Sequence, residues 1–522
     1  MACLLIQFIL PLVHPLMESD ITLGIDLGTT HSLVSYVDPQ TKELMSLSPP
    51  GLTTYPSTVH FSMNTTNPCV SFSDQAISGF ALCPKRLIGQ KFNESYNYDI
   101  KTYGSPVCGV EEGENENAPC SEIVPGYYIK SQKKKISATQ VDAMILKQMK
   151  KDAEERLGLK VSRAVITVPV VFTWSQRIET ERAAELAGFD SVELQLEPVM
   201  AAYEYCTANN LSDCTILIYD FGGGTFDICV VEYKDKVFSV LDCDGNSHLG
   251  GEDITMAICK ELENRITGVL HHDLYEGLSD ATIARIRLRI RCFAESKKVT
   301  IGESINRNIE VYLSNFYEDW EQHIDFNLNI NTVQSIVFRT IEMTKNMARK
   351  YSQIDKVLII GGSGDFCLVR ARLRELFDDR VVSNISPLRC VSCGAARYGH
   401  SREVVRVNEG TIFTRSILPK GIGILNTKKE PCYIAKKKDE LPRDISCRIK
   451  LSKEDNSLKT YLIEEKDNGF DVIKKLVISL GKTYPMGSEF VLRLFVRNDL
   501  LIYYEVRDSK NSILLPLTMV RI

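Results

Sequence analysis

One structural unit occurs twice in this chain: an apolar run, a turn rich in glycine and threonine, and a second apolar run. The first unit spans residues 21–37 and breaks at Gly28-Thr29-Thr30. The second spans 216–232 and breaks at Gly222-Gly223-Gly224-Thr225. Apolar runs around a tight turn predict two β-hairpins. Because the hairpins lie about 190 residues apart, they predict an internal duplication with two lobes that face each other.

The two turns have the composition of a phosphate-binding site. Backbone N–H groups in such a turn converge on an anion, glycine lets the backbone come close, and threonine hydroxyls add donors. Asp26 precedes the first turn, and Asp220 and Asp227 bracket the second. Carboxylates beside bound phosphates hold hydrated Mg²⁺ and position water. We therefore expect a nucleotide to bind with its phosphates between the turns.

Strands and helices alternate through the first 400 residues, which is typical of an α/β fold. The spacing of apolar residues predicts helices at 137–158, 175–187, 282–299 and 368–377, and buried strands at 164–168 and 357–360. After residue 404 the pattern changes to eight short apolar runs, which predict a small all-β domain. These runs cover 422–425, 432–435, 445–451, 458–463, 472–480, 489–496, 500–506 and 512–520.

These patterns divide the 522 residues into four parts. We expect a leader or alternative-start extension at 1–20, an α/β domain at 21–404, a connector at 405–420 and a β domain at 421–522. Residues 1–16 are apolar but have no Lys or Arg before the apolar run, and they are too short to span a membrane. Two readings stay open: a protein that begins at Met17 in the cytoplasm, or a secretory leader and the endoplasmic reticulum lumen.

Charge and cysteine usage narrow the class of partner and the compartment. The net charge of -5, with both signs mixed, gives no reason to expect nucleic acid as a partner. The 16 cysteines are scattered without paired CxxC motifs, which favours small buried side chains in a reducing compartment over a zinc site.

A third glycine motif, Gly361-Gly362-Ser363-Gly364, follows a predicted buried strand and opens a helix. This geometry suits the nucleoside end of the ligand, although a plain strand-to-helix turn has the same pattern. Its expected partner is the helix with Glu295 and Lys298, which lie on one face at i and i+3. A solvated ion pair is the alternative interpretation of those two residues.

Several motifs, in this order and spacing, resemble those of the 70-kDa heat-shock chaperones, the DnaK family. The resemblance runs from about residue 21 to the end of the chain. It implies an actin-like, two-lobed ATPase followed by a β-sandwich that binds extended hydrophobic peptides. The motifs are Gly24-Ile-Asp-Leu-Gly-Thr-Thr-His-Ser, Lys85-Arg-Leu-Ile-Gly-Gln-Lys, Val165-Ile-Thr-Val-Pro, Glu197-Pro, Tyr219-Asp-Phe-Gly-Gly-Gly-Thr-Phe-Asp, Leu249-Gly-Gly-Glu-Asp and Gly361-Gly-Ser.

The resemblance also implies a role for each matching residue. Asp26 and Asp220 would hold the water shell of Mg²⁺, and Lys85 would contact the γ-phosphate and the attacking water. Glu197, Asp227 and Thr225 would complete the catalytic set. ATP or ADP is the implied nucleotide, and K⁺ is a possible further ion. The implied nucleotide contacts are Gly28, Thr29, Thr30, Gly222, Gly223, Gly224, Thr225, Gly250, Gly251, Glu295, Lys298, Gly361, Gly362 and Ser363.

The chain departs from the family pattern near the nucleoside and in the connector. An arginine that stacks on adenine in the family is replaced by Asp365, and an acidic segment is replaced by Ser386-Pro-Leu-Arg. We expect weaker nucleotide affinity from the first change. The leucine-rich connector of the family is Thr411-Ile-Phe-Thr-Arg here, which weakens the expected coupling between the two domains.

The β domain departs from the pattern as well. Ile424 matches a peptide-contact position, but a neighbouring apolar position falls at Thr427 and the central pocket position falls at Lys459 or Thr460. A polar pocket weakens the capture of hydrophobic peptides. The last predicted strand runs to the end of the sequence, so we expect no helical lid.

Three hypotheses follow. The first is an ATP-hydrolysing chaperone that binds unfolded or nascent polypeptide and works with a J-domain co-chaperone and a nucleotide-exchange factor. The second is a ribosome-associated or regulatory member that binds ATP, hydrolyses little and serves as a scaffold for a J-protein. The third is an actin-like sugar kinase, which shares the hairpins but not the β domain.

Overall fold

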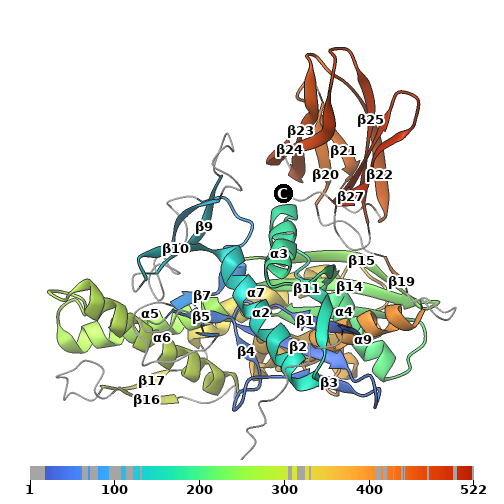
Figure 1. The fold of residues 1–522 in the computed structure, drawn as a ribbon. Helices are drawn as coiled ribbons and strands as arrows, with labels where there is room; N and C mark the ends of the chain where they lie inside the picture. Colours follow the sequence, from blue (N-terminus) through green and yellow to red (C-terminus); the bar gives the residue numbers. More distant parts are fainter. Residues whose placement is uncertain are drawn as a thin grey trace, which may run out of the picture.

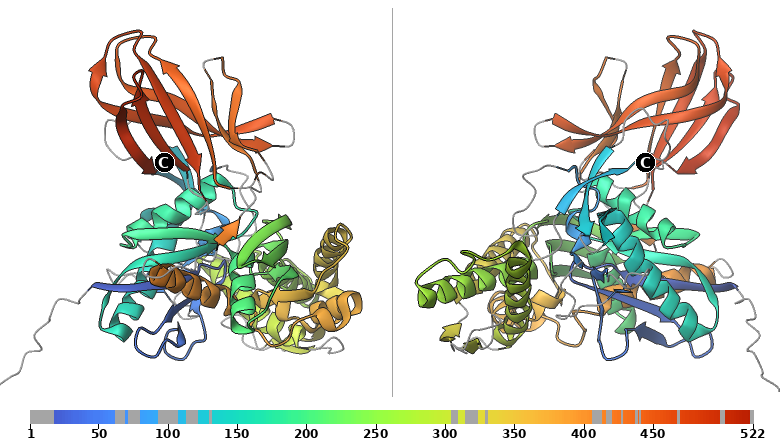
Figure 2. Two further views of the ribbon diagram at one scale, coloured as in Figure 1. Left: turned by 90° about the vertical axis from the view of Figure 1, so that its right-hand side faces the viewer. Right: turned by 60° about the vertical axis from the view of Figure 1, so that its left-hand side comes forward.

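A computed structural model shows the architecture, with two α/β lobes below a β-sandwich (Figures 1 and 2). No helix among the described residues is long and apolar enough to cross a membrane. The described residues are 18–61, 69–70, 80–92, 107–112, 122–129, 132–303, 309–313, 324–328, 331–405, 413–415, 420–426, 428–436, 439, 441–466, 469–497 and 502–519.

The first lobe is built on the sheet that contains the first hairpin. Its strand order is β12-β11-β1-β2-β3, with β4 paired to β2. β1 pairs in parallel with β11 and antiparallel with β2, so Asp26 lies at the end of a central strand. The strands are β1 (Glu18–Asp26), β2 (His31–Val37), β3 (Leu44–Leu47), β4 (Tyr55–Pro56), β11 (Lys160–Val168) and β12 (Ser191–Leu196).

The second lobe repeats this plan around the second hairpin. Its sheet has the order β18-β13-β14-β15-β19, and Asp220 lies opposite Asp227 across the hairpin. The predicted duplication of a strand, turn and strand unit is therefore present in two sheets. The strands are β13 (Cys214–Phe221), β14 (Phe226–Lys234), β15 (Val237–Asn246), β18 (Lys356–Ile360) and β19 (Phe413–Arg415).

Helices cover the sheets, and two of them join the lobes. α9 packs on β1 and β2 and also against α4, while α4 packs on β13 and β14 of the second sheet. The predicted helices at 137–158, 175–187, 282–299 and 368–377 are confirmed as α2, α3, α6 and α8. The helices are α2 (Ala138–Leu157), α3 (Trp174–Leu186), α4 (Glu197–Ala208), α5 (Gly251–Leu270), α6 (Asp280–Gly302), α7 (Asn331–Ala348), α8 (Cys367–Phe377) and α9 (Cys390–Val405).

Local capping sets the ends of the first two of these helices. Ser137 with Gln140 and Thr173 with Gln176 form reciprocal capping boxes at the starts of α2 and α3. α2 ends at Leu157, and its C-cap Gly158 has the left-handed conformation that favours glycine (φ 65°). These polar and glycine signals are local, which is why the sequence pattern located both helices.

Short elements fill the edges of the lobes. They include the 3-10 helix η1, which carries a predicted site residue, and η3, which follows β18. The elements are β5 (Thr58–His60), β6 (Cys69–Val70), β7 (Phe80–Leu82), η1 (Pro84–Arg86), β8 (Val107–Glu112), β9 (Glu122–Ile129), β10 (Lys134–Ser137), β16 (Ile309–Leu313), β17 (Ile324–Leu328), η3 (Gly362–Asp365) and η4 (Asp378–Arg380).

The C-terminal part is a sandwich of two four-stranded antiparallel sheets, β21-β20-β23-β24 and β22-β25-β26-β27. Its eight strands correspond to the eight apolar runs of the sequence, so the predicted all-β fold is confirmed. The strands are β20 (Ile422–Leu425), β21 (Pro431–Ala435), β22 (Arg443–Lys450), β23 (Asp455–Lys466), β24 (Gly469–Tyr484), β25 (Glu489–Val496), β26 (Ile502–Asp508) and β27 (Ile513–Met519).

Part of the predicted connector belongs to the second lobe. Phe413–Arg415 form β19, which pairs in parallel with Val237–Ser239 of β15 at the edge of the sheet. Residues 406–412 and 416–419 of the connector lie outside the described residues. The backbone pairing of a three-residue strand needs no leucine run, so the altered composition of the connector is compatible with this contact.

The sandwich contacts the first lobe at the N-terminus of α3. The carboxylate of Glu464, on β23, accepts the backbone N–H of Trp174 at 2.9 Å and the ammonium of Lys420 at 3.2 Å. The indole N–H of Trp174 donates to the carbonyl oxygen of Lys420 at 3.4 Å. Burial lowers the pKa of Arg177, and the opposing effect of Glu464 leaves it at about 10. A negative charge is favourable at a helix N-terminus, so the contact of Glu464 with the start of α3 stabilises the interface between the sandwich and the first lobe.

We predict that Glu464→Ala weakens this contact. The substitution removes the acceptor of a buried N–H and of Lys420, at a cost of about 1–3 kcal/mol. Trp174, now 2% exposed, should gain contact with water. In a Trp320→Phe background Trp174 is the remaining tryptophan, and its fluorescence emission should move to longer wavelength.

The matched control is Glu489→Gln on the same sandwich. Glu489 forms an exposed pair with Lys450 at 3.3 Å, and such pairs contribute little to stability. This control should keep the parent emission. An unchanged emission in Glu464→Ala would show that the burial of Trp174 does not depend on this carboxylate.

Candidate functional site

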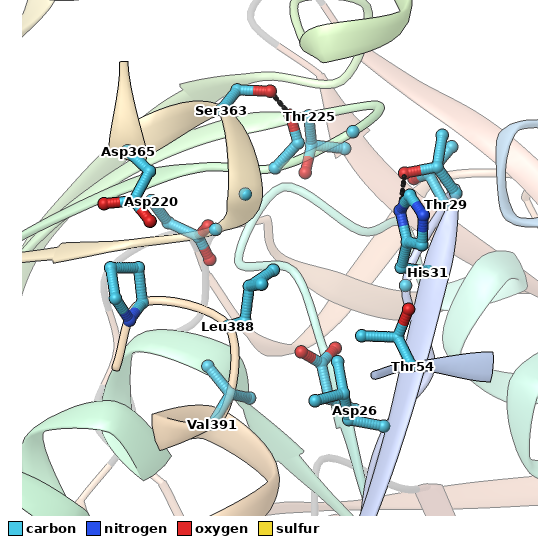
Figure 3. A pocket seen from close by; sticks show the side chains of 18 of the residues that line it. Asp26, Thr29, His31, Thr54, Asp220, Thr225, Ser363, Asp365, Leu388 and Val391 are labelled. Atoms are coloured by element: carbon cyan, nitrogen blue, oxygen red, sulfur yellow. Dashed lines mark hydrogen bonds between the residues drawn. The ribbon is translucent and has the colours of Figure 1, made fainter. Parts of the chain in front are cut away.

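The two hairpin turns lie in contact across the lobes. A Cβ atom added to Gly223 would collide with the hydroxyl of Thr30, and one added to Gly224 would collide with that of Thr29. Only glycine allows this approach. Between and beside the turns is a pocket of about 450 Å³, to which both lobes contribute (Figure 3).

Most of the predicted site residues line this one pocket, from both lobes. Figure 3 shows Asp26 and Thr29 on the side of the first lobe, with Asp220, Thr225 and Ser363 across from them. The predicted residues on the wall are Asp26, Gly28, Thr29, Thr30, Lys85, Glu197, Asp220, Gly222, Gly223, Thr225, Glu295, Lys298, Gly361, Gly362 and Ser363.

Four predicted residues lie behind the wall. Asp227 accepts a hydrogen bond from the backbone N–H of Val171 at 3.2 Å. Gly224 is packed against Thr29, so that an added Cβ would collide with the threonine side chain. The N-terminus of α5 supports the second turn: the N–H of Gly251 donates to Gly222 at 2.9 Å. A Cβ on Gly250 would meet the carbonyl oxygen of Gly223 at 2.5 Å. The three glycines hold the turn in place. Asp227 lies next to the pocket without being part of its lining.

The phosphate end of the pocket contains a buried ion pair. The ammonium of Lys85, on η1, donates to the carboxylate of Glu197 at 2.6 Å, and both side chains are less than one-tenth exposed. Glu197 is the first residue of α4, where Pro198 at the next position suits the start of a helix. A charge-assisted bond at this distance fixes the direction of the lysine side chain.

Burial and mutual repulsion disfavour the charged form of the aspartates. Desolvation, and then Glu197, raises the pKa of Asp26 to about 7 and that of Asp227 to about 7. The same two causes, together with the other aspartates, raise the pKa of Asp220 well above its usual value. Burial alone would lower the pKa of Lys85, but Glu197, Asp26 and Asp220 raise it on balance. The site therefore has more acids than Lys85 can compensate.

These acids suit a hydrated divalent cation. Among the described residues, no three His, Cys, Asp or Glu side chains converge closely enough to ligate a metal directly. Mg²⁺ keeps several waters and takes one or two carboxylates together with phosphate oxygens. Asp26 and Asp220, at the ends of β1 and β13, match that need, and the Oδ2 atom of Asp227 is buried without a hydrogen-bond partner.

The other end of the pocket is formed by α6 and η3. Lys298 pairs with Glu295 at 2.6 Å and with the hydroxyl of Thr255 at 3.1 Å, and its side chain is buried. The pair is therefore not the solvated one considered as the alternative. The hydroxyl of Ser363 donates to the carbonyl oxygen of Gly222 at 3.0 Å, which ties η3 to the second turn.

Sequence reasoning missed several residues of the wall, among them His31, Thr54, Leu388 and Val391. The ring of His31 lies 3.1 Å from the hydroxyl of Thr30. His31 adjoins the first turn, so the motif itself was a signal for it. Val391, at the start of α9, and Leu388, just before the helix, also line the pocket. No local pattern in the sequence indicates that these two residues lie beside the nucleotide-binding turns.

The fold and the site together define a two-lobed, actin-like α/β protein with a β-sandwich. The profile of the family described as "Hsp70 protein" matches residues 22–442. The chain belongs to the Hsp70 family.

Similar curated proteins come from distant organisms. Heat shock protein hsp-6 of Caenorhabditis elegans is 30% identical over 390 residues, and Heat shock cognate HSP70 protein of Trypanosoma brucei brucei is 32% identical over 400. A ribosome-associated molecular chaperone of Nakaseomyces delphensis is 31% identical over 392 residues. Each alignment covers 72% of this chain but only 56% to 60% of the relative.

We predict that Gly250→Ala impairs nucleotide binding without unfolding the protein. The new Cβ would press on the backbone of Gly223 and Gly224 and displace the second turn from the pocket. A loss of about tenfold or more in affinity for a fluorescent ADP analogue is expected, which corresponds to about 1.4 kcal/mol. Fluorescence titration measures the affinity, and circular dichroism checks the fold.

Gly268→Ala, on the same helix, is the control. An added Cβ at residue 268 would meet no atom of the described residues within 4 Å, and alanine is the better helix former by about 1 kcal/mol. The control should bind nucleotide like the parent. Equal affinities in Gly250→Ala and Gly268→Ala would contradict the supporting role of the α5 N-terminus.

Proposed function

We propose that this protein is an ATP-dependent molecular chaperone that binds ATP with Mg²⁺ and hydrolyses it. The observation that carries the proposal is the convergence of both turns with the Lys85–Glu197 pair and the two aspartates Asp26 and Asp220 on one pocket. The ribosome-associated molecular chaperone of Nakaseomyces delphensis, one of the similar proteins, supports the chaperone role.

In this proposal the chain acts on ATP mainly by positioning and by charge. The backbone N–H groups of the two turns and the hydroxyls of Thr29, Thr30 and Thr225 bind the phosphates. Lys85 neutralises charge on the transferred phosphoryl group, and Glu197 holds its ammonium in place. Bound Mg²⁺, with its water shell on Asp26 and Asp220, would neutralise further phosphate charge.

The attacking water is positioned from behind the second turn. Asp227 lies across the hairpin from Asp220, and its buried Oδ2 is available to accept a hydrogen bond. Together with Glu197, it would orient the water toward the terminal phosphate. This arrangement needs no covalent intermediate.

The sandwich is the proposed binding site for extended polypeptide. Ile424 is packed in its core, and Thr460 donates its hydroxyl to the carbonyl oxygen of Leu425 at 2.9 Å. Lys459 forms an ion pair with Asp455 at 2.9 Å. Thr427 lies outside the described residues. Because Lys459 and Thr460 are polar, we propose that the sandwich binds the peptide through main-chain hydrogen bonds and not through a deep apolar pocket.

The proposed partners are unfolded or nascent polypeptide, a J-domain co-chaperone and a nucleotide-exchange factor, in the cytoplasm. A ribosome-associated scaffold for a J-protein, with ATP binding but little hydrolysis, is the second candidate. The polar character of Lys459 and Thr460 is the observation that favours it.

Single-turnover hydrolysis tests the proposal, with Thr225→Ala as the variant. Thr225 closes the second turn, where its carbonyl oxygen accepts the N–H of Gly222 at 3.1 Å. Loss of a hydroxyl that serves the transition state should slow hydrolysis by about a hundredfold. ATP affinity should change by less than about threefold, because that change corresponds to well under 1 kcal/mol.

Thr207→Ala, at an exposed position on α4, is the control and should hydrolyse ATP like the parent. Faster turnover on addition of an unfolded peptide supports the chaperone. Tight ATP binding with a rate near zero, whether peptide is present or not, would favour the scaffold. Unchanged turnover in Thr225→Ala would refute the role of this hydroxyl.

A further inference from the structure

Asp142, on α2, is a buried acid that does not line the nucleotide pocket. Its side chain is fully buried, and neither carboxyl oxygen has a hydrogen-bond partner among the described residues. Buried polar groups in proteins are nearly always hydrogen-bonded, and a buried ionised group without partners is very unfavourable. The position therefore favours the neutral acid.

Asp142 is close to the short helix that carries Lys85. α2 packs against η1, and the charge of Lys85 acts on Asp142. Tyr127, on β9, belongs to the same buried cluster: its hydroxyl donates to the carbonyl oxygen of Leu82 at 2.6 Å, and Asp142 raises its pKa. Lys85 thus has a second buried acid near it, in addition to Glu197 at 2.6 Å.

The protonation state of Asp142 changes in an accessible pH range. Burial raises the pKa of Asp142 to about 8, although the positive charge of Lys85 lowers it. The carboxyl group is therefore mostly neutral at neutral pH and becomes ionised above about pH 8.

The groups around this carboxyl keep their charge state near that pH. Burial raises the pKa of Tyr127 well above its usual value and that of Cys83 to about 12. On β5, burial lowers the pKa of His60, so this ring is neutral. On α3, Glu179 pairs with Arg182 at 3.7 Å. The cations on β10 and β11 are exposed or half-buried: Lys134, Lys135, Lys160 and Arg163.

The charge on Asp142 affects how Lys85 serves a bound phosphate. A neutral Asp142 leaves the ammonium to Glu197 and to the terminal phosphate. An ionised Asp142 attracts the same ammonium and adds a negative charge near a site that already has an excess of acids. Lys85 then compensates less of the charge on the transferred phosphoryl group.

We propose that Asp142 is a positioning residue for hydrolysis: as the neutral acid it leaves Lys85 to the terminal phosphate, and as the carboxylate it competes for that ammonium. This inference rests on the proposed ATPase function and on the role of Lys85 in it. Its distinct content is that an acid outside the pocket limits hydrolysis at high pH.

The pH dependence of single-turnover hydrolysis, at saturating ATP with Mg²⁺, tests the proposal. At about pH 9 only about a tenth of the Asp142 side chains is neutral. The rate of the parent protein, relative to that of Asp142→Asn, should therefore fall by about fivefold or more between about pH 7 and about pH 9. The asparagine variant has nearly the same shape but does not ionise, and the other acids of the site titrate alike in both proteins.

Two further variants make this comparison secure. Glu155→Gln, on the same helix, is the matched control, because Glu155 is exposed and pairs only at 3.6 Å with Lys151. It should follow the pH profile of the parent. If Asp142→Asn does not fold, Asp142→Thr replaces it, because a threonine hydroxyl can donate to the carbonyl oxygen one turn back in its own helix.

ADP affinity separates positioning from damage to the pocket. ADP lacks the phosphate that Lys85 is proposed to contact, so its Kd should agree within about twofold between the parent and Asp142→Asn at each pH. A change in ADP affinity as large as the change in rate would overturn the positioning role.

Thermal unfolding checks the neutral state independently of ATP. The pKa of Asp142 is raised in the folded protein, so the stability that its protonation contributes is fully present below about pH 4 and is lost as the pH rises to about 8. The Tm of the parent should therefore fall more steeply over this range than that of Asp142→Asn. Parallel curves would show that Asp142 is ionised in the folded protein, which contradicts the proposal.

Identical pH profiles of hydrolysis in the parent and in Asp142→Asn would also overturn the role of Asp142. A parent protein that hydrolyses no ATP at any pH would instead refute the proposed ATPase. The two failures are distinguishable, because the first requires measurable turnover in both proteins.

Discussion

The close contact between the two hairpin turns determines how the lobes and the pocket between them are arranged. Gly223 and Gly224 pack directly on Thr30 and Thr29, and a side chain at either glycine would push the lobes apart. Because of this contact, backbone N–H groups from two lobes can face one anion. α5 and η3 are hydrogen-bonded to the second turn, so their positions follow from it.

The contact between the turns also places several buried carboxylates close together. Asp26 is the last residue of β1, Asp220 is the last but one of β13, and the charge of Lys85, on η1, acts on both. Burial and the negative charge of Glu197 raise the pKa values of both aspartates. A pocket with this imbalance is stable in its charged form only with additional positive charge, which hydrated Mg²⁺ supplies in the proposed function.

The contact between the sandwich and the lobe is of a different kind. Glu464 places a buried carboxylate at the N-terminus of α3, and Trp174 is covered at the same point. β19 independently extends the sheet of the second lobe with three residues from the predicted connector. The sandwich thus contacts the first lobe through Glu464, while the connector strand β19 pairs with the sheet of the second lobe.

Local patterns in the sequence were enough to predict several elements of the structure. The turns of residues 28–30 and 222–225, the capping boxes of α2 and α3 and the eight sandwich strands depend on residues close together in the chain. The order and spacing of the motifs also predicted most of the residues that line the pocket. Three other features could be seen only in the folded structure: Lys298 is buried, Leu388 lies beside Gly362, and Glu464 accepts the N–H of Trp174 at the start of α3. Those contacts join segments tens to hundreds of residues apart, and their geometry depends on how the lobes and the sandwich pack.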